Sequence, residues 1–487
     1  MLVTGTLTRV ERKNPFQVIF GFFKGVAVDF VEGDIFVKLS LLVMGAGYFR
    51  RRQYIKGLIM TAFQAVIIFF SFTFAAHYLS RFGTLGTVEF ASVFNPETMR
   101  NEINDFDHSF QILLYGIVSI IVLAGFALFY LRNIRNVRAL EVRNKLGKHI
   151  PTFLEDIKSA RDEKFHITIL SLPCIGIVLF TIVPLIVMIS VAFTSYDQLN
   201  MPPASLFTWV GLDNFRVLFS NSITDTFGYA FGIVLSWTLF WAFAATFSNY
   251  FLGIGLASLI NNNQTKLKRM WRTMFIIPAA VPQFVTLLLV RNFFATQGIA
   301  NTIASEWGIT EFLTKIGMVP GHLGYIPFLT DPIWARTMII LINIWIGVPF
   351  TMLIATGVLM NIPKELYESA RIDGAGPVKQ FTKITMPYML FVTAPFLVTQ
   401  VVHNINNFNV IFLLTQDVYR TTDQMLAISH AREVDLLVTW LYRLTQEQYD
   451  YKMASVIGIM VFVVCAIFTL LAFNLIINRN KEDKFQI

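Results

Sequence analysis

Residues 361–387 read NIPKELYESARIDGAGPVKQFTKITMP, a polar island between two long apolar runs. Pro363 stands where a helix can begin, because its missing N–H costs nothing in a first turn. The letters KELYESARI that follow predict one short helix. Gly374, Gly376 and Pro377 are expected to end it, since glycine accepts a positive φ and proline cannot continue the hydrogen-bond ladder.

The second half of the island, VKQFTKIT, predicts another short helix with Phe381 and Ile384 on one face. Pro387 marks the return into lipid, so the whole stretch predicts a helix–turn–helix at a membrane surface. The charged side chains left to meet water would be Glu368, Arg371, Asp373, Lys379 and Lys383. A solvated loop of a polytopic protein would show the same charges, so charge alone does not assign a role.

The composition is that of a membrane protein. Of 487 residues, 55% are hydrophobic and only 14% are charged, against the ~25% charged residues usual in soluble domains. The mean hydropathy is +0.59. The net charge of +8 does not indicate nucleic-acid binding, because the basic residues gather beside apolar segments. The cysteines, Cys174 and Cys465, fall inside apolar runs, so we expect neither a disulfide framework nor a metal site.

The apolar runs predict an all-α polytopic fold with eight spans, each long enough to cross a bilayer at about 1.5 Å per residue. They are Gly57–Tyr78, Gln111–Leu131, Ile167–Phe193, Trp237–Ile260, Thr273–Phe293, Thr337–Met360, Tyr388–Thr415 and Met453–Ile477. The first 56 residues show no pattern of a cleavable signal peptide. Within them Ile35–Phe49 is apolar but short, which predicts an interfacial segment.

The distribution of lysine and arginine predicts the orientation. Nine basic residues lie between the second and third spans, within residues 132–164, and others follow the fourth, sixth and eighth spans. The alternate connections are poorer in positive charge, although residues 416–452 are mixed, with four basic and six acidic side chains. Both termini and the 361–387 island are therefore expected on the cytoplasmic side.

The sequence carries no catalytic or nucleotide-binding pattern. It has no G-x-x-x-x-G-K-S/T motif, so we do not expect ATP to bind this chain through a phosphate-binding loop. The seven histidines do not cluster as metal ligands, and the acidic pairs lie in loops, where solvated charge explains them. We expect no enzymatic active site, metal or cofactor in this chain.

Polar side chains inside two predicted spans are candidate binding groups, because amides in hydrocarbon are costly unless they face a bundle interior or a watery cavity. Two sets would share a face of a continuous helix: His403, Asn404 and Asn407 in the seventh span, and Asn343, Gly347 and Phe350 in the sixth. Amides supply donors and acceptors, an aromatic ring supplies a flat apolar surface, and glycine permits close approach, as a neutral sugar would need. Interhelical hydrogen bonding would use the same amides.

The order of residues in the 361–387 island closely resembles the EAA motif of ABC importer permeases. The matching positions are Glu368, Ser369, Ala370, Asp373, Gly374, Ala375 and Gly376, followed by Phe381, Ile384 and Pro387. In that family the motif is the coupling helix that docks in a cleft of the cytoplasmic ATPase, so the resemblance implies the same role here. Ser369 replaces the family's middle alanine, and its similar size should still fit a tight cleft.

Three membrane segments resemble the MalF-type permease subunit of maltose and maltodextrin ABC importers: IPAAVPQF at 277–284, NIWIGVPF at 343–350 and NINNFNVIFLLT at 404–415. The segment VGLDNF at 210–215 and the number of spans match it as well. The resemblance implies that the sugar touches Asn343, Ile346, Gly347, Phe350, His403, Asn404, Asn407, Ala279 and Gln283. The chain departs from the enterobacterial pattern at Ala279, Gln283 and His403, which leaves the identity of the sugar open.

By this resemblance the chain is a permease subunit of a type I ABC importer for oligosaccharides, with maltodextrins as the first candidate and another oligosaccharide as the second. It would sit in the bacterial cell membrane with a homologous permease subunit, an ATPase dimer that binds ATP and Mg²⁺, and an extracellular sugar-binding protein. The expected division is an interfacial or cytoplasmic segment at 1–56, two additional spans with a basic linker at 57–165, and the permease core at 166–487.

Two other classes of protein would show part of this pattern. A secondary transporter would need ionisable residues within its spans to couple ions, and acidic residues are nearly absent there. A membrane scaffold would not need the polar faces of the sixth and seventh spans. ATP hydrolysis that rises with sugar-loaded binding protein would distinguish an importer from both.

Overall fold

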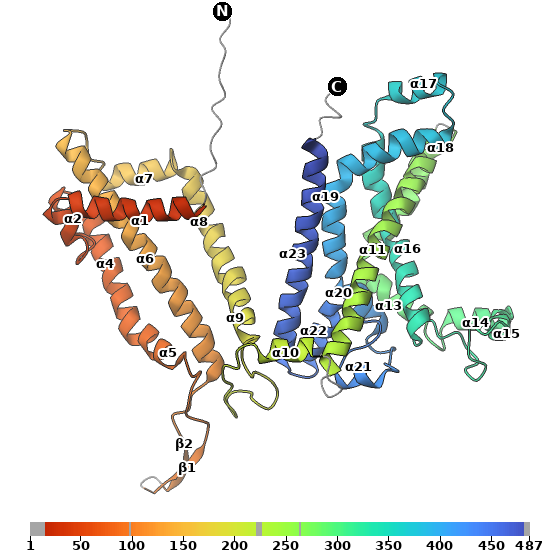
Figure 1. The fold of residues 1–487 in the computed structure, drawn as a ribbon, viewed down its shortest axis with the longest axis horizontal. Coiled ribbons are helices and arrows are strands. Elements are labelled where there is room, and N and C mark those ends of the chain that lie inside the picture. The colour runs from red at the N-terminus through yellow and green to blue at the C-terminus, as the bar shows by residue number, and fades with distance from the viewer. Residues whose placement is uncertain (1–14, 97–98, 221–225, 263, 482–487) are drawn as a thin grey trace, which may run out of the picture. The chain divides into compact units, whose positions relative to one another are not determined.

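The structure is a computed structural model that describes residues 15–96, 99–220, 226–262 and 264–481. Its regular structure is helical, as predicted, apart from two short strands that pair antiparallel, β1 (Ser92–Asn95) and β2 (Arg100–Ile103) (Figure 1). Contacts divide the chain into two compact units. The N-terminal unit comprises residues 1–190 and 199–209, and the C-terminal unit comprises residues 191–198 and 210–487.

The helices of the N-terminal unit are α1 (Pro15–Glu32), α2 (Ile35–Leu39), α3 (Ala46–Arg50), α4 (Tyr54–Phe70), η1 (Ser71–Ala75), α5 (Ala76–Arg81), α6 (Ser109–Lys145), α7 (Phe153–Arg161), α8 (Phe165–Ile177), η2 (Val178–Ile182) and α9 (Val183–Val191). In this unit α1 lies across α4 and α6 rather than along them (Figure 1). The predicted interfacial segment Ile35–Phe49 forms α2 and most of α3. Each has five residues, too few to cross a bilayer.

The C-terminal unit contains α10 (Asp213–Phe219), α11 (Thr226–Asn261), α12 (Lys268–Ile276), η3 (Ile277–Ala280), α13 (Gln283–Phe293), α14 (Ile299–Glu306), α15 (Ile309–Lys315), α16 (Pro332–Leu359), α17 (Lys364–Ile372), α18 (Pro377–Gln380), η4 (Phe381–Thr385), α19 (Met386–Ile405), α20 (Phe408–Thr415), α21 (Gln424–Ile428), α22 (Leu437–Gln446) and α23 (Tyr451–Lys481). The long helix α11 is central, since it packs along both α16 and α19.

Seven helices or helical runs of the described residues are long and apolar enough to cross a membrane. They are Tyr54–Arg81, Ser109–Lys145, Phe165–Val191, Thr226–Asn261, Pro332–Leu359, Pro377–Thr415 and Tyr451–Ile476. Each covers one of the predicted spans, so seven of the eight are confirmed as apolar helical segments of spanning length.

The prediction of one continuous span at Thr273–Phe293 is wrong. The segment is divided into α12, the 3-10 turn η3 and α13, and α13 has only 11 residues. Pro282 supplies the physical reason, because proline lacks a donor N–H and drives the preceding residue out of helical geometry. Val281 is accordingly extended, with ψ 130°.

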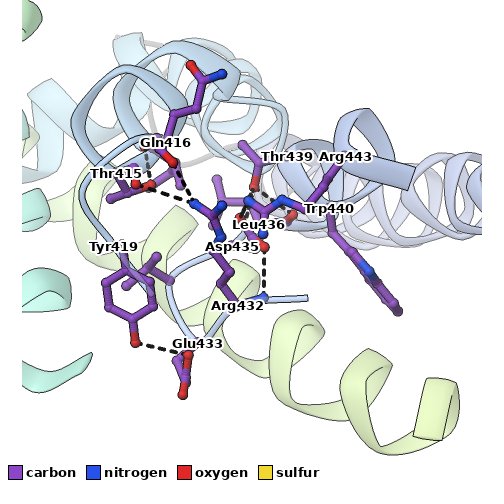
Figure 2. A network of polar contacts seen from close by, with 12 residues as sticks. Thr415, Gln416, Tyr419, Arg432, Glu433, Asp435, Leu436, Thr439, Trp440 and Arg443 are labelled. Carbon is purple, nitrogen blue, oxygen red and sulfur yellow. Dashed lines mark hydrogen bonds and ion pairs between the residues drawn. The ribbon is translucent and has the colours of Figure 1, made fainter. Parts of the chain in front are cut away.

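Residues 416–450, between α20 and α23, form a folded segment rather than a loose connection. Two buried carboxylates organise it (Figure 2). Asp435 accepts hydrogen bonds from the Arg443 guanidinium at 3.1 Å and the Arg432 backbone N–H at 2.8 Å. Glu433 accepts from the Tyr419 hydroxyl at 3.0 Å. Arg336 of α16 donates to the Glu433 carbonyl oxygen, which ties this segment to the bundle.

Candidate functional site

The polar island forms the turn that the sequence predicts between α17 and α18. Helix α17 spans Lys364–Ile372 and follows Pro363 directly, as predicted. Gly374 has φ +75°, and the Ala375 N–H bonds the Ala370 carbonyl at 2.8 Å, which closes the end of the helix. Gly376 instead has φ −70°, so only the first of the two glycines needs the left-handed conformation.

The second half of the island differs from the prediction of a separate short helix. Helix α18 continues through the π-helical turn η4 into α19, so the chain does not break at Pro387. Pro387 lies in the first turn of α19, where a missing N–H is tolerated, and the π-helical turn before it has already shifted the hydrogen-bond ladder.

The residues of the island that match the EAA motif lie on an exposed surface. Glu368, Ser369 and Asp373 are exposed, and no described residue forms an ion pair with either carboxylate. Two apolar side chains beside them are also exposed to solvent: Ile372 is 87% exposed and Val378 is 77% exposed. Such exposure of apolar side chains on an otherwise ordered turn is typical of a protein-docking surface.

One hydrogen bond links α17 to the run that continues into α19, and another closes the turn itself. The Tyr367 hydroxyl of α17 pairs with the Thr385 hydroxyl of η4 at 2.8 Å, and the Gln380 amide donates to the Ala375 carbonyl at 2.7 Å. A displacement of α17 would therefore act directly on the run that continues into α19.

A cavity of about 370 Å³ lies within the C-terminal unit. Its walls come from α11, α13, α16, α19 and the residue before α20. The residues predicted from the sequence that line it are Gln283, Asn343, Ile346, Gly347, Phe350, His403, Asn404 and Asn407. Ala279, also predicted, belongs to η3, and its side chain lies outside the described part of the chain.

The prediction that His403, Asn404 and Asn407 share one face of a continuous helix is wrong in its geometry. Helix α19 ends at Ile405, and α20 begins at Phe408. Asn407 stands in the break, and its side-chain oxygen accepts from the Val410 N–H at 3.4 Å. Asparagine side chains compete with the helix for backbone hydrogen bonds, so a run of them favours a break. All three residues still reach the cavity.

The amides at the break after α19 have hydrogen-bond partners within the chain, and the amide of α16 differs from them. The Asn404 amide donates to the Thr246 hydroxyl of α11 at 2.9 Å, and the Asn407 amide donates to the Asn404 oxygen at 3.4 Å. The bond to Thr246 joins α19 to α11, so Asn404 serves interhelical packing whatever else it does. Asn343 is only 6% exposed, yet no described residue bonds its side-chain nitrogen.

Sequence reasoning missed the contribution of α11. Thr246, Asn249 and Tyr250 line the cavity from this helix. The signal was present, because polar side chains three residues apart inside an apolar span are the same pattern that drew attention to Asn404 and Asn407. Gln400 and Phe396 of α19 complete the wall.

The lining indicates a neutral, hydroxyl-rich ligand. Amides, hydroxyls and one imidazole face the cavity together with the half-exposed ring of Phe350, and its lining includes no carboxylate, ammonium or guanidinium group among the described residues. A larger groove of about 560 Å³ between α11 and α16 has a mostly apolar lining and no amide. A third cavity, of about 340 Å³ in the N-terminal unit, has amides as well, but Arg81, Asp105 and Asp107 also line it. Of these three cavities, the one of about 370 Å³ combines several amides with a lining free of charged groups.

Comparison with known proteins gives consistent results. The family described as "Binding-protein-dependent transport system inner membrane component" matches residues 249–481. The maltodextrin transport system permease protein MdxF of Bacillus subtilis (strain 168) is 32% identical over 439 residues, covering 90% of this chain and 94% of MdxF. The galactooligosaccharides transport system permease protein GanP of the same organism is 32% identical over 428 residues, covering 87% of this chain and 93% of GanP.

A solved structure shares the fold. A chain from the crystal structure of a bacterial ABC transporter involved in the import of the acidic polysaccharide alginate aligns with a TM-score of 0.52 and 24% sequence identity. The alignment covers 67% of the present chain and 99% of the alginate transporter chain.

Proposed function

Because the chain belongs to the binding-protein-dependent transport system inner membrane components, the permease subunits of ABC importers, we propose that the sugars crossing through it are maltodextrins. The observation that carries the proposal is the uncharged cavity lined by Asn343, Asn404, Asn407 and Phe350. Amides can pair with the hydroxyls at the edge of a pyranose, and an aromatic ring can lie against its C–H face. A relative of equal identity is named for galactooligosaccharides, which makes these sugars the second candidate.

The exposed turn at residues 361–387 would be the surface that meets a separate ATPase. The chain has no phosphate-binding loop, so ATP and Mg²⁺ would bind that partner. The exposed Ile372 and Val378 support burial against another protein, and Glu368 and Asp373 would add polar contacts at its edge. A second permease subunit would complete the translocation path, and a binding protein would deliver the sugar.

The positive charges beside the spans support a cytoplasmic position for the 361–387 turn. Residues 361–387 and 416–450 lie at opposite ends of the C-terminal unit (Figure 1). The turn would face the cytoplasm together with both termini, and the 416–450 segment would face outward. Alternating access would then proceed by ATP-driven movement of α17 and α18, because ATP binds more tightly to one of the two states of the assembly.

The test is uptake by a complex reconstituted with its partners. We expect Asn343→Ala to lower maltodextrin uptake per assembled complex by roughly one to two orders of magnitude, because a hydrogen bond is lost and a sugar hydroxyl is left unsatisfied on burial. ATP hydrolysis stimulated by the loaded binding protein should persist. Phe350→Ala should act in the same direction through the loss of a stacking surface.

Two results would contradict the proposal. Normal uptake per complex by the variants at Asn343, Asn404 and Asn407 would remove the sugar from this cavity. A panel of maltodextrins and galactooligosaccharides presented with the cognate binding protein decides between the two candidate sugars. Uptake of galactooligosaccharides alone would replace maltodextrins in the proposal.

A further inference from the structure

Asn249 of α11 lies against Gly347 of α16. A Cβ atom added at Gly347 would overlap the Nδ2 of Asn249 and would lie 2.7 Å from its Cγ and 3.0 Å from its Oδ1. Real Cβ atoms do not approach other heavy atoms so closely, so a side chain at 347 would have to displace the Asn249 amide. The glycine therefore makes room for an asparagine of the same chain.

The amide held in this way has no hydrogen-bond partner in the part of the chain that the structure describes. No described residue forms a hydrogen bond with the Asn249 side chain, and its Oδ1 is buried without a partner. The Nδ2 of Asn343, one helical turn before Gly347, is buried and unpaired as well. One atom lacks a donor and the other lacks an acceptor, and both residues line the same cavity.

Helix packing alone does not account for this arrangement. An amide that served only to join α11 to its neighbours would be bonded across the interface, as the Asn404 amide is to the Thr246 hydroxyl at 2.9 Å. Leaving a buried polar atom unsatisfied is destabilising. A ligand that carries hydroxyl groups would satisfy both atoms, because a hydroxyl donates to Oδ1 and accepts from Nδ2.

We propose that Asn249 is a specificity-determining residue of the cavity, which recognises sugar hydroxyls as a donor–acceptor pair with Asn343, and that Gly347 acts by positioning Asn249. The inference rests on the proposed function, since it assigns this pair to the same sugar. It also revises the role of Gly347, which the sequence analysis placed in direct contact with the ligand. The ligand class is a neutral pyranose with hydroxyls at its edge.

The test measures the dissociation constant of maltotriose for the purified complex without its binding protein. We expect Asn249→Ala to raise Kd about three- to tenfold, as the loss of one neutral hydrogen bond predicts. Gly347→Ala should raise Kd to the same extent, because its methyl group displaces the Asn249 amide. The double variant should bind no more weakly than Asn249→Ala, since the added methyl group then fills the space that the amide leaves.

Two controls separate recognition from packing. Ser248→Ala changes the adjacent residue, whose hydroxyl bonds the Ala245 carbonyl of its own helix and does not line the cavity, so Kd should stay unchanged. Monodeoxy analogues of maltotriose, tested on the unmodified chain, need no variant to fold. One analogue should bind more weakly than maltotriose to the unmodified chain and equally well to Asn249→Ala.

The outcomes that overturn the inference are distinct from those that overturn the proposed function. An unchanged Kd for Asn249→Ala, with weakened binding by Asn343→Ala, removes Asn249 from recognition and leaves the sugar in the cavity. A further loss on adding Gly347→Ala to Asn249→Ala would place Gly347 in direct contact with the ligand. Unchanged binding by the variants at Asn249, Asn343, Asn404 and Asn407 together would overturn the proposed function itself.

Discussion

Gly374 is the residue on which the turn after α17 depends. Its φ of +75° is one that residues with a Cβ adopt only at a cost, and a Cβ added there would meet nothing within 4 Å in this chain. The strain of a substitution is therefore in the backbone, and any clash would be with a partner. Gly376 has the same open surroundings but a negative φ, so it provides a matched control.

We predict that Gly374→Asp yields a complex that reaches the membrane but loses transport and stimulated ATP hydrolysis. The left-handed conformation costs a non-glycine residue about 1–2 kcal/mol, and a carboxylate would enter the surface that we propose meets the ATPase. Gly376→Ala should keep most of both activities. Normal uptake by Gly374→Asp would show that this turn does not couple the two subunits.

The side-chain nitrogen of Asn404 has a hydrogen-bond partner, whereas that of Asn343 has none among the described residues. We predict that Thr246→Val, which removes the hydroxyl bonded to the Asn404 amide, destabilises the chain by about 1–3 kcal/mol, the cost of an unsatisfied buried group. The thermal unfolding temperature of the purified complex should fall. Thr273→Val provides the control, because that exposed hydroxyl bonds only the Arg269 carbonyl of its own helix. Equal unfolding temperatures for both variants would show that the Asn404–Thr246 bond contributes nothing.

At the scale of elements, local signals predicted helix ends well where a few residues decide them. The bounds of α17 follow from Pro363 and Gly374, residues that act on their own backbone. The breaks within the fifth and seventh predicted spans were missed, because hydropathy averages over a window longer than the break. Pro282 and Asn407 carried the signal, and both breaks adjoin the cavity. The two breaks in the helices are therefore among the features that shape the cavity.

In the sequence, the 416–450 segment mixes acidic and basic side chains without a clear pattern. In the structure, its buried carboxylates accept specific hydrogen bonds. Glu433 is 9% exposed and accepts from the Tyr419 hydroxyl and from the backbone N–H groups of Thr422 and Asp423. Burial raises the pKa of this carboxyl, but the hydrogen bonds outweigh burial and hold the pKa below its ordinary value. A lowered pKa stabilises the fold above the unfolded value, and that stability is lost as the pH falls through the folded value.

We predict that Glu433→Gln lowers the unfolding temperature at neutral pH, because the variant loses charge-assisted hydrogen bonds worth about 1.5–3 kcal/mol each. The difference from the unmodified chain should shrink as the pH falls below the ordinary pKa of a glutamate carboxyl and through the lower pKa that Glu433 has in the fold. Glu447→Gln is the control, since that side chain is 39% exposed and lies 3.7 Å from the Arg443 guanidinium. A pH-independent difference would show that ionisation of Glu433 does not stabilise the segment.

At the scale of the whole chain, the candidate sites lie in the C-terminal unit, and the match to the permease family, residues 249–481, lies there too. The predicted core begins at residue 166, whereas contacts group α8 and α9 with the N-terminal unit through α7. The sequence could not decide which unit α8 and α9 pack with. The run from Phe165 to Val191 is apolar on all sides, so its pattern does not say which neighbour it packs against, and Leu172 and Phe180 remain 76% and 82% exposed.

We predict that a chain beginning at residue 165, which keeps α8 and all later helices, still assembles with its partners and shows sugar-stimulated ATP hydrolysis. The physical reason is that the turn at 361–387 and the cavity are built from residues after 240, while the first two spans contribute a separate set of contacts. The alginate transporter chain, which aligns over 99% of its length with 67% of this one, shows that the shared fold does not need the whole chain. The measurement is sugar-stimulated ATP hydrolysis per assembled complex. The truncated chain carrying Gly374→Asp should lose this stimulation. That loss would show that the activity retained by the truncated chain depends on the same turn. A truncated chain that assembles but hydrolyses ATP without regard to sugar would place part of the coupling in residues 1–164.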